Sequence, residues 1–351
     1  MSADKLNRHN PSLNLTPFLD SLTGEGLYFD HLYTTGKHTF NGIFSTLFSF
    51  PALYRQHPLK YIRKYDGAIT SLLDYGYSTI YFTTHDGQFD NVEGFLRANG
   101  FQNIVSQRDY PSSEVKTNLG VTDDYMFRYS IPILSGLANK DAPFFATFMT
   151  ASDHGPYYVP KYFRPHSKDV KQQIVEYADW SLKKFILLAS QESWYQNTLF
   201  VFVADHGGPL NITYDIPLNY FHSPLLFYGS YLDFDPTVSH KMASQMDVMP
   251  TLMGMLNIPY VNNTMGVDLC NEDRPYALIN DDDKVGVIDS SWFCIIKEKG
   301  SDLHLYNYPK RDKVDYINEE RVRAERMADY AKSMMQLYQN MIIENQLVLK
   351  Q

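Results

Sequence analysis

The chain has 351 residues, of which 44% are hydrophobic and 20% are charged, with 40 acidic against 31 basic side chains. This length is enough for one large α/β domain or two ordinary domains with a substantial apolar core. The formal net charge of −9 argues against a general nucleic-acid-binding protein, which usually has a basic face. The two cysteines, Cys270 and Cys294, exclude a cysteine-rich disulfide or zinc module. They could pair with each other, but we expect two buried thiols.

The hydrophobic pattern alternates between helix and strand periodicity along the first 256 residues. In chain order it predicts a helix at 15–22, a strand or turn at 26–30, helices at 42–50 and 66–75, a strand at 78–83, helices at 89–98 and 124–136, and a strand at 143–149. A helix at 171–188, strands at 199–203 and 224–228, and a helix at 244–256 follow. The continuous apolar runs at 143–149 and 199–203 are typical of buried central strands.

The pattern changes after residue 257. Short strands are predicted at 276–279, 284–289, 292–296 and 303–308, and a long charged helix at 319–349. We therefore predict an α/β fold with a mostly parallel central sheet between helices, and a small antiparallel sheet with a long helix at the carboxyl end. The expected division is a main domain at 1–268 and a small α+β subdomain at 269–351.

Polar side chains directly follow three of the predicted strands, where open α/β sheets carry their reactive groups. After the strand at 199–203 stand Asp205 and His206, followed by two glycines. A carboxylate and a neutral imidazole are good ligands for a divalent ion. The alternative is that this pair only caps the following loop.

Three further histidines are candidates for the same region. His154 and His85 follow the strands at 143–149 and 78–83. His154 could donate a hydrogen bond to a phosphate oxygen or complete the ligand shell of a metal ion. Alternatively, it could hydrogen-bond to its own turn. For His85, a functional and a structural role are likewise both open. His222, at the start of another strand, could line a pocket or be structural.

Thr39 is the candidate nucleophile, because it lies in a hydroxyl-rich turn that opens a predicted helix. Free N–H groups and the helix dipole favour an anion at such a place. A hydroxyl bound to a metal can lose its proton near neutral pH and act as a nucleophile. From the residues alone, a simple helix cap is the alternative.

These motifs resemble the lipoteichoic acid synthase and phosphoglycerol transferase group of the alkaline phosphatase and sulfatase superfamily. The segments that carry the resemblance are 36–42 (GKHTFNG), His85, 150–154 (TASDH), 204–207 (ADHG) and 244–252 (SQMDVMPTL). They follow one another in the expected order through nearly the whole chain. The resemblance implies an alkaline phosphatase-like fold, with residues 1–268 as the sulfatase-like catalytic domain.

The resemblance also implies roles for individual residues. Thr39 would be the nucleophile and a metal ligand, and Asp205 and His206 would be metal ligands. His154 and His85 would lie in the phosphate pocket, with His154 assisting the departing or incoming oxygen. One divalent ion is implied, for which manganese is preferred and zinc and magnesium are alternatives. A threonine in place of the formylglycine signature argues against sulfate ester hydrolysis.

The chain departs from the family pattern in two places. In the family, a strand ending in Glu-Ser precedes the residues that match Met1–Asp4, and its Glu is a metal ligand, whereas this chain begins after that place. We expect truncation of a longer protein in preference to a metal-free relative. The family's Trp and Arg after the first pocket histidine are also missing, and Phe89 could replace the aromatic wall. The group that is transferred therefore stays open: it could be phosphoglycerol, phosphoethanolamine or another phosphodiester group.

The expected function is a metal-dependent phosphotransferase that moves a phosphoglycerol-type or phosphoethanolamine-type group from a phospholipid to a glycan or polymer hydroxyl through phosphothreonine. The alternatives are a sulfatase or phosphodiesterase hydrolase with the same centre, and a degenerate non-catalytic module. The expected location is a bacterial cell membrane, with this domain facing the periplasm or the outside. Membrane association would come from an absent N-terminal region, since no apolar run here approaches roughly 20 residues, and the fragment itself is expected to be soluble.

Overall fold

The strands in the described part of the chain form three separate sheets. The computed structural model describes residues 1–53, 55–139, 142–208, 212–230, 235–297, 300 and 302–349. In chain order the strands are β1 (Leu27–Tyr33), β2 (Ser78–Thr83), β3 (Asn103–Val105), β4 (Phe144–Met149), β5 (Phe200–Val203), β6 (His222–Tyr228), β7 (Thr237–Ser244), β8 (Ala277–Asp281), β9 (Lys284–Ile288), β10 (Phe293–Lys297) and β11 (Asp302–Tyr306). Their orders are β5-β6-β1-β7, β3-β2-β4 and β11-β10-β9-β8.

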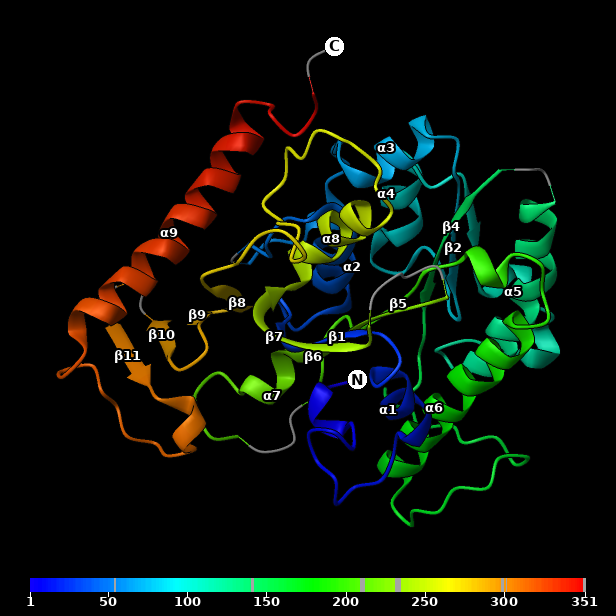
Figure 1. Ribbon diagram of the computed structural model, residues 1–351, viewed down its shortest axis with the longest axis horizontal. Coiled ribbons are helices and arrows are strands. Elements are labelled where there is room, and N and C mark those ends of the chain that lie inside the picture. The colour runs from blue at the N-terminus through cyan, green and yellow to red at the C-terminus, as the bar shows by residue number, and fades with distance from the viewer. Residues whose placement is uncertain are drawn as a thin grey trace.

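The helices lie around these sheets (Figure 1). In chain order the α-helices are α1 (Pro17–Thr23), α2 (Thr39–Phe48), α3 (Ala68–Asp74), α4 (Val92–Ala98), α5 (Asp123–Ala138), α6 (Val170–Ala189), α7 (Leu218–Phe221), α8 (Val248–Met255) and α9 (Arg321–Ile343). Helix α9 runs along the sheet β8–β11 at one side of the molecule, whereas α5 and α6 lie at the opposite side (Figure 1). The N-terminus lies in the middle of this view.

Strands β2, β3 and β4 are parallel to one another, and β1 is parallel to β7. Strand β6 is antiparallel to both β1 and β5, and β8–β11 pair antiparallel throughout. The α/β fold class, the mostly parallel central strands and the small carboxyl-terminal antiparallel sheet with its long helix are therefore confirmed.

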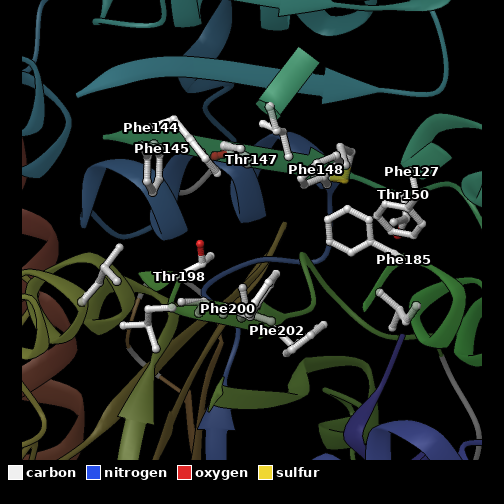
Figure 2. Close-up of a pocket in the computed structure, with 18 of the residues that line it drawn as sticks. Phe127, Phe144, Phe145, Thr147, Phe148, Thr150, Phe185, Thr198, Phe200 and Phe202 are labelled. Carbon is white, nitrogen blue, oxygen red and sulfur yellow. The ribbon is translucent and has the colours of Figure 1, made fainter. Parts of the chain in front are cut away.

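Successive side chains of β4 and β5 pack into two different apolar cores, one on each face. Phe148 and Phe202 pack with residues of α5 and α6, such as Phe127 and Phe185 (Figure 2). Met149, on the other face, belongs to the core that α2, α3 and α8 build. Because side chains of a strand alternate between the faces of a sheet, this arrangement makes a helix–sheet–helix sandwich.

The structure corrects five expectations from the sequence. Strands β3 and β7 were not predicted, and β1 extends to Tyr33. The helix expected at 89–98 becomes regular only at Val92, because Asp90 and Asn91 have left-handed backbone angles. We expected β4 and β5 to be fully buried central strands, but their residues are half-buried. The reason is that, within the described part of the chain, each strand has a neighbour on one side only. Cys294 is a buried thiol as expected, but Cys270 is exposed, and both are free.

A buried ion pair fixes the start of α8 against the sheet. Asp247 is fully buried, and its two carboxylate oxygens accept hydrogen bonds from the Arg274 guanidinium at 2.7 and 2.5 Å. The same carboxylate accepts the backbone N–H of Ser244 and of Val267. These four bonds explain how a charged group is tolerated in the core.

None of the helices in the described ranges is both long enough and apolar enough to cross a membrane.

Candidate active site

Thr39 is the first residue of α2, a ten-residue helix whose amino end follows β1 through a short loop. The small antiparallel sheet holds this loop in place. The backbone N–H of Asn280 donates to the carbonyl of Thr35 at 2.8 Å, and the Lys37 ammonium lies 2.5 Å from Asp281. The predicted subdomain at 269–351 therefore contributes directly to the position of the candidate nucleophile.

Thr39, Asp205 and His206 converge on one point although they are far apart in the sequence. Oγ1 of Thr39 lies 3.5 Å from Nε2 of His206, and that nitrogen lies 3.4 Å from Oδ2 of Asp205. Nδ1 of His206 is 2.7 Å from the carbonyl oxygen of Gly207, so Nδ1 must carry the proton because a carbonyl can only accept. The lone pair of Nε2 therefore faces the other two oxygens.

This donor set fits a divalent metal ion. Ligands at adjacent vertices of a tetrahedral or octahedral shell, with bonds of about 2.0–2.2 Å, lie roughly 2.9–3.6 Å apart. The 3.4 and 3.5 Å separations at His206 fall in that range. A metal-binding imidazole also commonly donates its other N–H to a carbonyl, as His206 does to Gly207.

The local electrostatics keep Asp205 ionised. Burial alone would raise the pKa of this carboxyl, but electrostatic attraction by His206 and by the Met1 amino group opposes that effect. The backbone N–H of His206 also donates to the carboxylate, and the hydroxyl of Thr39 lowers the pKa further. The net result is a pKa below the usual value, as a metal-binding carboxylate needs.

Two close backbone approaches make this convergence possible. A Cβ on Gly42 would lie 2.6 Å from the Cα of Asp205, so only glycine lets α2 approach the end of β5 this closely. A Cβ on Gly207 would lie 2.8 Å from the carbonyl oxygen of Asn219.

Gln245 is a buried positioning residue that the sequence analysis missed. Its Nε2 donates to the carbonyls of Ala204 and Asp205, at 2.9 and 2.7 Å, while its Oε1 accepts the N–H of Thr35 at 3.2 Å. One fully buried side chain thus ties the loop before Thr39 to the strand end that carries Asp205. Its only signal in the sequence was its place two residues before Asp247.

His85 and His154 are brought near each other at the ends of β2 and β4. Burial lowers the pKa of His85, Asp86 opposes this effect, and the charge of His154 lowers the pKa further. Nδ1 of His154 lies 2.6 Å from the carbonyl of Gly155, so its own loop orients the exposed ring. Phe89 is 61% exposed, with its ring centroid 5.7 Å from that of His85.

Two carboxylates anchor the loop that carries His154. Asp123, on α5, accepts the backbone N–H groups of Ala151 and Ser152 at 2.8 and 3.1 Å. Asp153 lies 2.5 Å from the Lys5 ammonium, which links the same loop to the amino-terminal segment.

His222 is held by protein groups at both ring nitrogens. Nδ1 lies 2.9 Å from Oδ1 of Asp4, and Nε2 lies 2.8 Å from the carbonyl oxygen of Asp30. These contacts join the amino-terminal segment to β1 and favour the structural alternative for this histidine.

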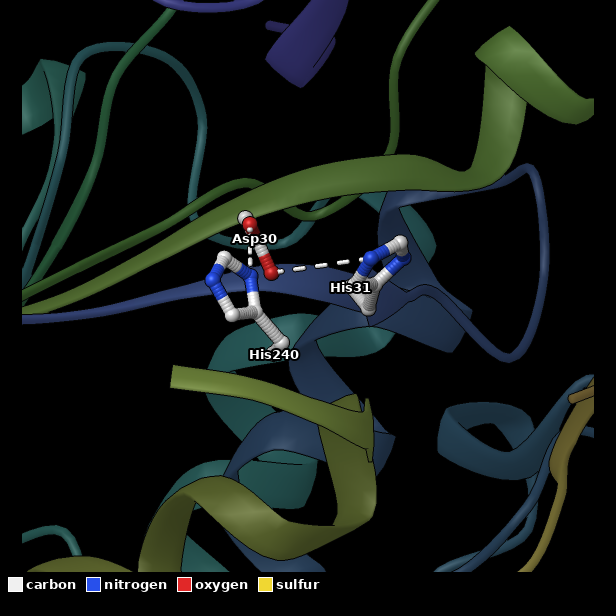
Figure 3. Close-up of side chains that lie close together, drawn as sticks. All are labelled: Asp30, His31 and His240. Atoms are coloured by element: carbon white, nitrogen blue, oxygen red, sulfur yellow. Dashed lines mark hydrogen bonds and ion pairs between the residues drawn. The ribbon is translucent and has the colours of Figure 1, made fainter. Parts of the chain in front are cut away.

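A second cluster of metal-ligand types lies in the middle of β1 (Figure 3). Asp30, His31 and His240 each offer one ligand atom, and these atoms lie within 4.8 Å of one another. A pairing irregularity after Phe29 interrupts the regular register of β1 here. Nδ1 of His240 is 2.7 Å from Oδ2 of Asp30, so one carboxylate oxygen is already engaged. Asp30 and His31 lie within β1 and His240 lies within β7, whereas Thr39 and Asp205 follow the ends of β1 and β5.

Comparison with known proteins identifies the family. The sulfatase family model matches residues 1–258, so the chain belongs to the sulfatase family. It is 23% identical over 304 residues to the lipoteichoic acid synthase-like protein YvgJ of Bacillus subtilis, covering 78% of this chain and 49% of that protein. The chain thus spans about half the length of this curated relative.

Solved structures share the fold. A protein of the alkaline phosphatase superfamily from Vibrio parahaemolyticus superposes with a TM-score of 0.84 at 24% identity, covering 94% of this chain and 84% of that one. The lipoteichoic acid synthase LtaP from Listeria monocytogenes gives a TM-score of 0.82 at 20% identity, over 94% of this chain and 86% of that one. The resemblance stated from the motifs is confirmed, and the family fold implies an enzyme with a divalent metal site. The individual roles of the candidate site residues stay predictions: Thr39, His85, Phe89, His154, Asp205, His206 and His222.

Proposed function

We propose that this chain is the catalytic domain of a metal-dependent phosphotransferase. It would move a phosphoglycerol-type or phosphoethanolamine-type group from a phospholipid to a hydroxyl of a glycan or polymer. The observation that carries the proposal is the hydroxyl of Thr39, held at the amino end of α2 and 3.5 Å from Nε2 of His206. Similarity to proteins named lipoteichoic acid synthases supports transfer over hydrolysis.

Thr39, Asp205 and His206 would hold the divalent ion, for which manganese is proposed and zinc and magnesium are alternatives. When bound, the ion would supply positive charge that lowers the pKa of the Thr39 hydroxyl and neutralises the phosphodiester. The N–H groups at the start of α2 add donors for the phosphate oxygens.

In the first step Thr39 Oγ1 forms a bond to phosphorus, and the bond from phosphorus to the lipid alcohol oxygen breaks. The Thr39 proton is lost, and the departing alcohol gains one, with His154 as the proposed proton carrier. In the second step an acceptor hydroxyl attacks the phosphothreonine, gives up its proton, and releases Thr39. The phosphoryl group is conserved throughout, and water in place of the acceptor would give hydrolysis.

The surroundings of His85 leave the head group open. Asp86 is exposed, and Asp90 pairs with His57 at 3.2 Å, while Asn91 donates to the carbonyl of Leu59. These contacts do not decide between the two head groups. Similarity to proteins named lipoteichoic acid synthases supports the phosphoglycerol type, and the phosphoethanolamine type is the alternative.

The phospholipid donor would place the enzyme at a bacterial cell membrane, with this domain on the periplasmic or outer side. The acceptor would be a glycan or polyol carrying free hydroxyls. Both partners follow from the proposed reaction.

The test supplies the purified chain with manganese and either phosphatidylethanolamine or phosphatidylglycerol in detergent micelles, together with a glycan acceptor. Diacylglycerol release with a mass-shifted acceptor supports transfer. Release of free phosphoethanolamine or glycerol phosphate without a modified acceptor supports a phosphodiesterase, and sulfate release from a sulfate ester supports a sulfatase. Metal binding without any turnover of these substrates, and without phosphorylation of Thr39, supports the non-catalytic module.

A further inference from the structure

Asp30, His31 and His240 bring metal-ligand side chains together outside the candidate active site (Figure 3). Asp30 and His31 lie on β1, and His240 lies on β7, the outermost strand of this sheet in the described part of the chain. Successive side chains of a regular strand point to opposite faces of the sheet, so those of Asp30 and His31 would ordinarily diverge. Their convergence must come from the local backbone.

An irregularity in strand pairing explains the convergence. Toward β6, Asp30 and His31 together stand opposite the single residue Pro224. Toward β7, the single residue Asp30 stands opposite both His240 and Lys241. Proline has no backbone N–H with which to continue the ladder, and a bulge of this kind re-aims the side chains of the strand. The bulge thus brings the two neighbouring side chains of β1 together and sets His240 beside them.

The distances within the cluster are close to those of a metal shell. The Asp30 carboxylate lies between the two imidazole rings (Figure 3). Nδ1 of His240 is 2.7 Å from Oδ2 of Asp30, and Nε2 of His31 is 3.7 Å from Oδ1. Ligands at adjacent positions around zinc, with bonds of about 2.0–2.2 Å, lie roughly 3–3.6 Å apart. Small side-chain movements would therefore place all three residues on one ion.

The protein leaves part of this cluster without partners. Oδ1 of Asp30 and Nδ1 of His31 are buried atoms with no hydrogen-bond partner in the described part of the chain. The 3.7 Å between Oδ1 and Nε2 is too long for a hydrogen bond, and no described lysine or arginine pairs with this carboxylate. A buried carboxylate oxygen without a donor or a cation is costly, and such a group in a folded protein indicates a place for a water or an ion.

The Asp30 ligand is also held in place before any ion binds. Its side chain is only 16% exposed, and its backbone carbonyl accepts a hydrogen bond from Nε2 of His222 at 2.8 Å. The bulge fixes His31 next to it, and the pairing of β7 with β1 fixes His240. Ligands that are already in position lose little conformational entropy when they bind an ion.

We propose that Asp30, His31 and His240 form a zinc-binding site, separate from the candidate active site, that ties β7 to β1 across the bulge. One carboxylate oxygen and two imidazole nitrogens are typical zinc ligands, and such a donor set binds zinc more tightly than manganese. The His240 side chain is 75% exposed, so water can reach the ion and complete its shell. The inference does not depend on the proposed reaction.

The test is a zinc titration of the full chain carrying Asp205→Asn and His206→Ala, which remove the proposed ligands of the candidate active site. Calorimetry, and metal analysis after dialysis, should show one equivalent of bound zinc. In this background, His240→Ala and Asp30→Asn should each weaken zinc binding by about tenfold or more. Absence of zinc binding in the background variant, or an unchanged affinity after His240→Ala, would overturn the proposal.

His304→Ala is the matched control. His304 also lies beside two carboxylates, but Nδ1 contacts Asp315 at 2.7 Å and Nε2 contacts Asp302 at 3.1 Å. Because the two ring nitrogens point in different directions, these three residues cannot share one ion. The substitution should leave the affinity and the stoichiometry of zinc unchanged. Loss of the zinc ion in this variant would assign it to His304 and contradict the proposal.

Thermal unfolding of the chain with its active-site residues intact provides a second check. Zinc should raise the unfolding midpoint, because an ion that binds only the folded chain stabilises it. With zinc in large excess, this increase should be smaller in the His240→Ala variant by about 3 °C or more. His240 is mostly exposed, so the midpoints without zinc should differ little. An equal increase in both proteins would show that zinc does not bind at this cluster.

Discussion

The hydroxyl oxygen of Thr39 lies 3.5 Å from Nε2 of His206, although 167 residues separate the two in the sequence. The separation is that of two ligands on one metal ion. It also leaves the Thr39 hydroxyl at the end of α2, facing the place where a phosphate would bind. In the proposed reaction, the chemistry of the site would depend on this pair.

Thr39→Ala should abolish transfer, with a loss on the order of 10³-fold or more, because the reaction loses its nucleophile. Thr39→Ser keeps a hydroxyl at the same place and should retain measurable activity. The measurement is diacylglycerol release, with mass spectrometry of the phosphorylated peptide and circular dichroism as a check on folding. Turnover of the folded alanine variant close to that of the native chain would remove Thr39 from the mechanism.

Asp205→Asn and His206→Ala should each lower metal affinity by about tenfold or more, since each removes a ligand atom. The matched control is His240→Ala, which disrupts the Asp30 cluster and should leave the stoichiometry of bound manganese unchanged. Manganese titration, followed by calorimetry or by metal analysis after dialysis, gives both results. Loss of manganese in the His240 variant would instead assign that ion to the Asp30 cluster.

Gln245→Leu should destabilise the fold by about 1–3 kcal/mol, because the N–H of Thr35 and the carbonyl of Asp205 lose their side-chain partner. It should also weaken metal binding, since Thr35 and Asp205 are no longer tied together. Urea unfolding and manganese titration measure the two effects. A loss of stability with unchanged metal affinity would show that Gln245 serves only the fold.

Asp179 should make stability depend on pH. It accepts the N–H groups of Phe18 and Leu19 at the start of α1, and burial raises its pKa to about 6. Between about pH 4 and 6 the folded chain therefore binds more protons than the unfolded chain, so the contribution of this group falls as pH rises. The free energy of unfolding, taken relative to Asp179→Asn, should drop by up to about 3 kcal/mol across that window. A flat difference between the two proteins would contradict the raised pKa.

The sequence alone was sufficient to find the residues that stand at element ends. Asp205 and His206 follow an apolar run and precede two glycines, and Thr39 opens a helix. Such local patterns are visible because strand and helix periodicities stop where the chain turns. The helix at Val92 was misplaced at its start, because left-handed backbone at Asp90 and Asn91 leaves no clear signal in the composition.

The supports of the site could not be found in this way. Asp281 and Asp282 lie between two predicted strands and gave no functional signal, yet they bind Lys37 and His38. Gln245 gave no functional signal either. Strand β7 was also missed, because its exposed and buried residues do not alternate regularly. These features depend on contacts between distant segments.

The sequence by itself therefore determined the fold class, the family and the candidate nucleophile and metal ligands, because short local motifs indicate each of them. Only the tertiary structure decided that Thr39, Asp205 and His206 meet, that Gln245 and the small sheet hold them, and that β1 and β7 bring Asp30 and His240 together. The physical reason is that strand pairing and burial bring together residues separated by tens to hundreds of positions in the sequence. Local periodicity carries no information about which strand edges will pair.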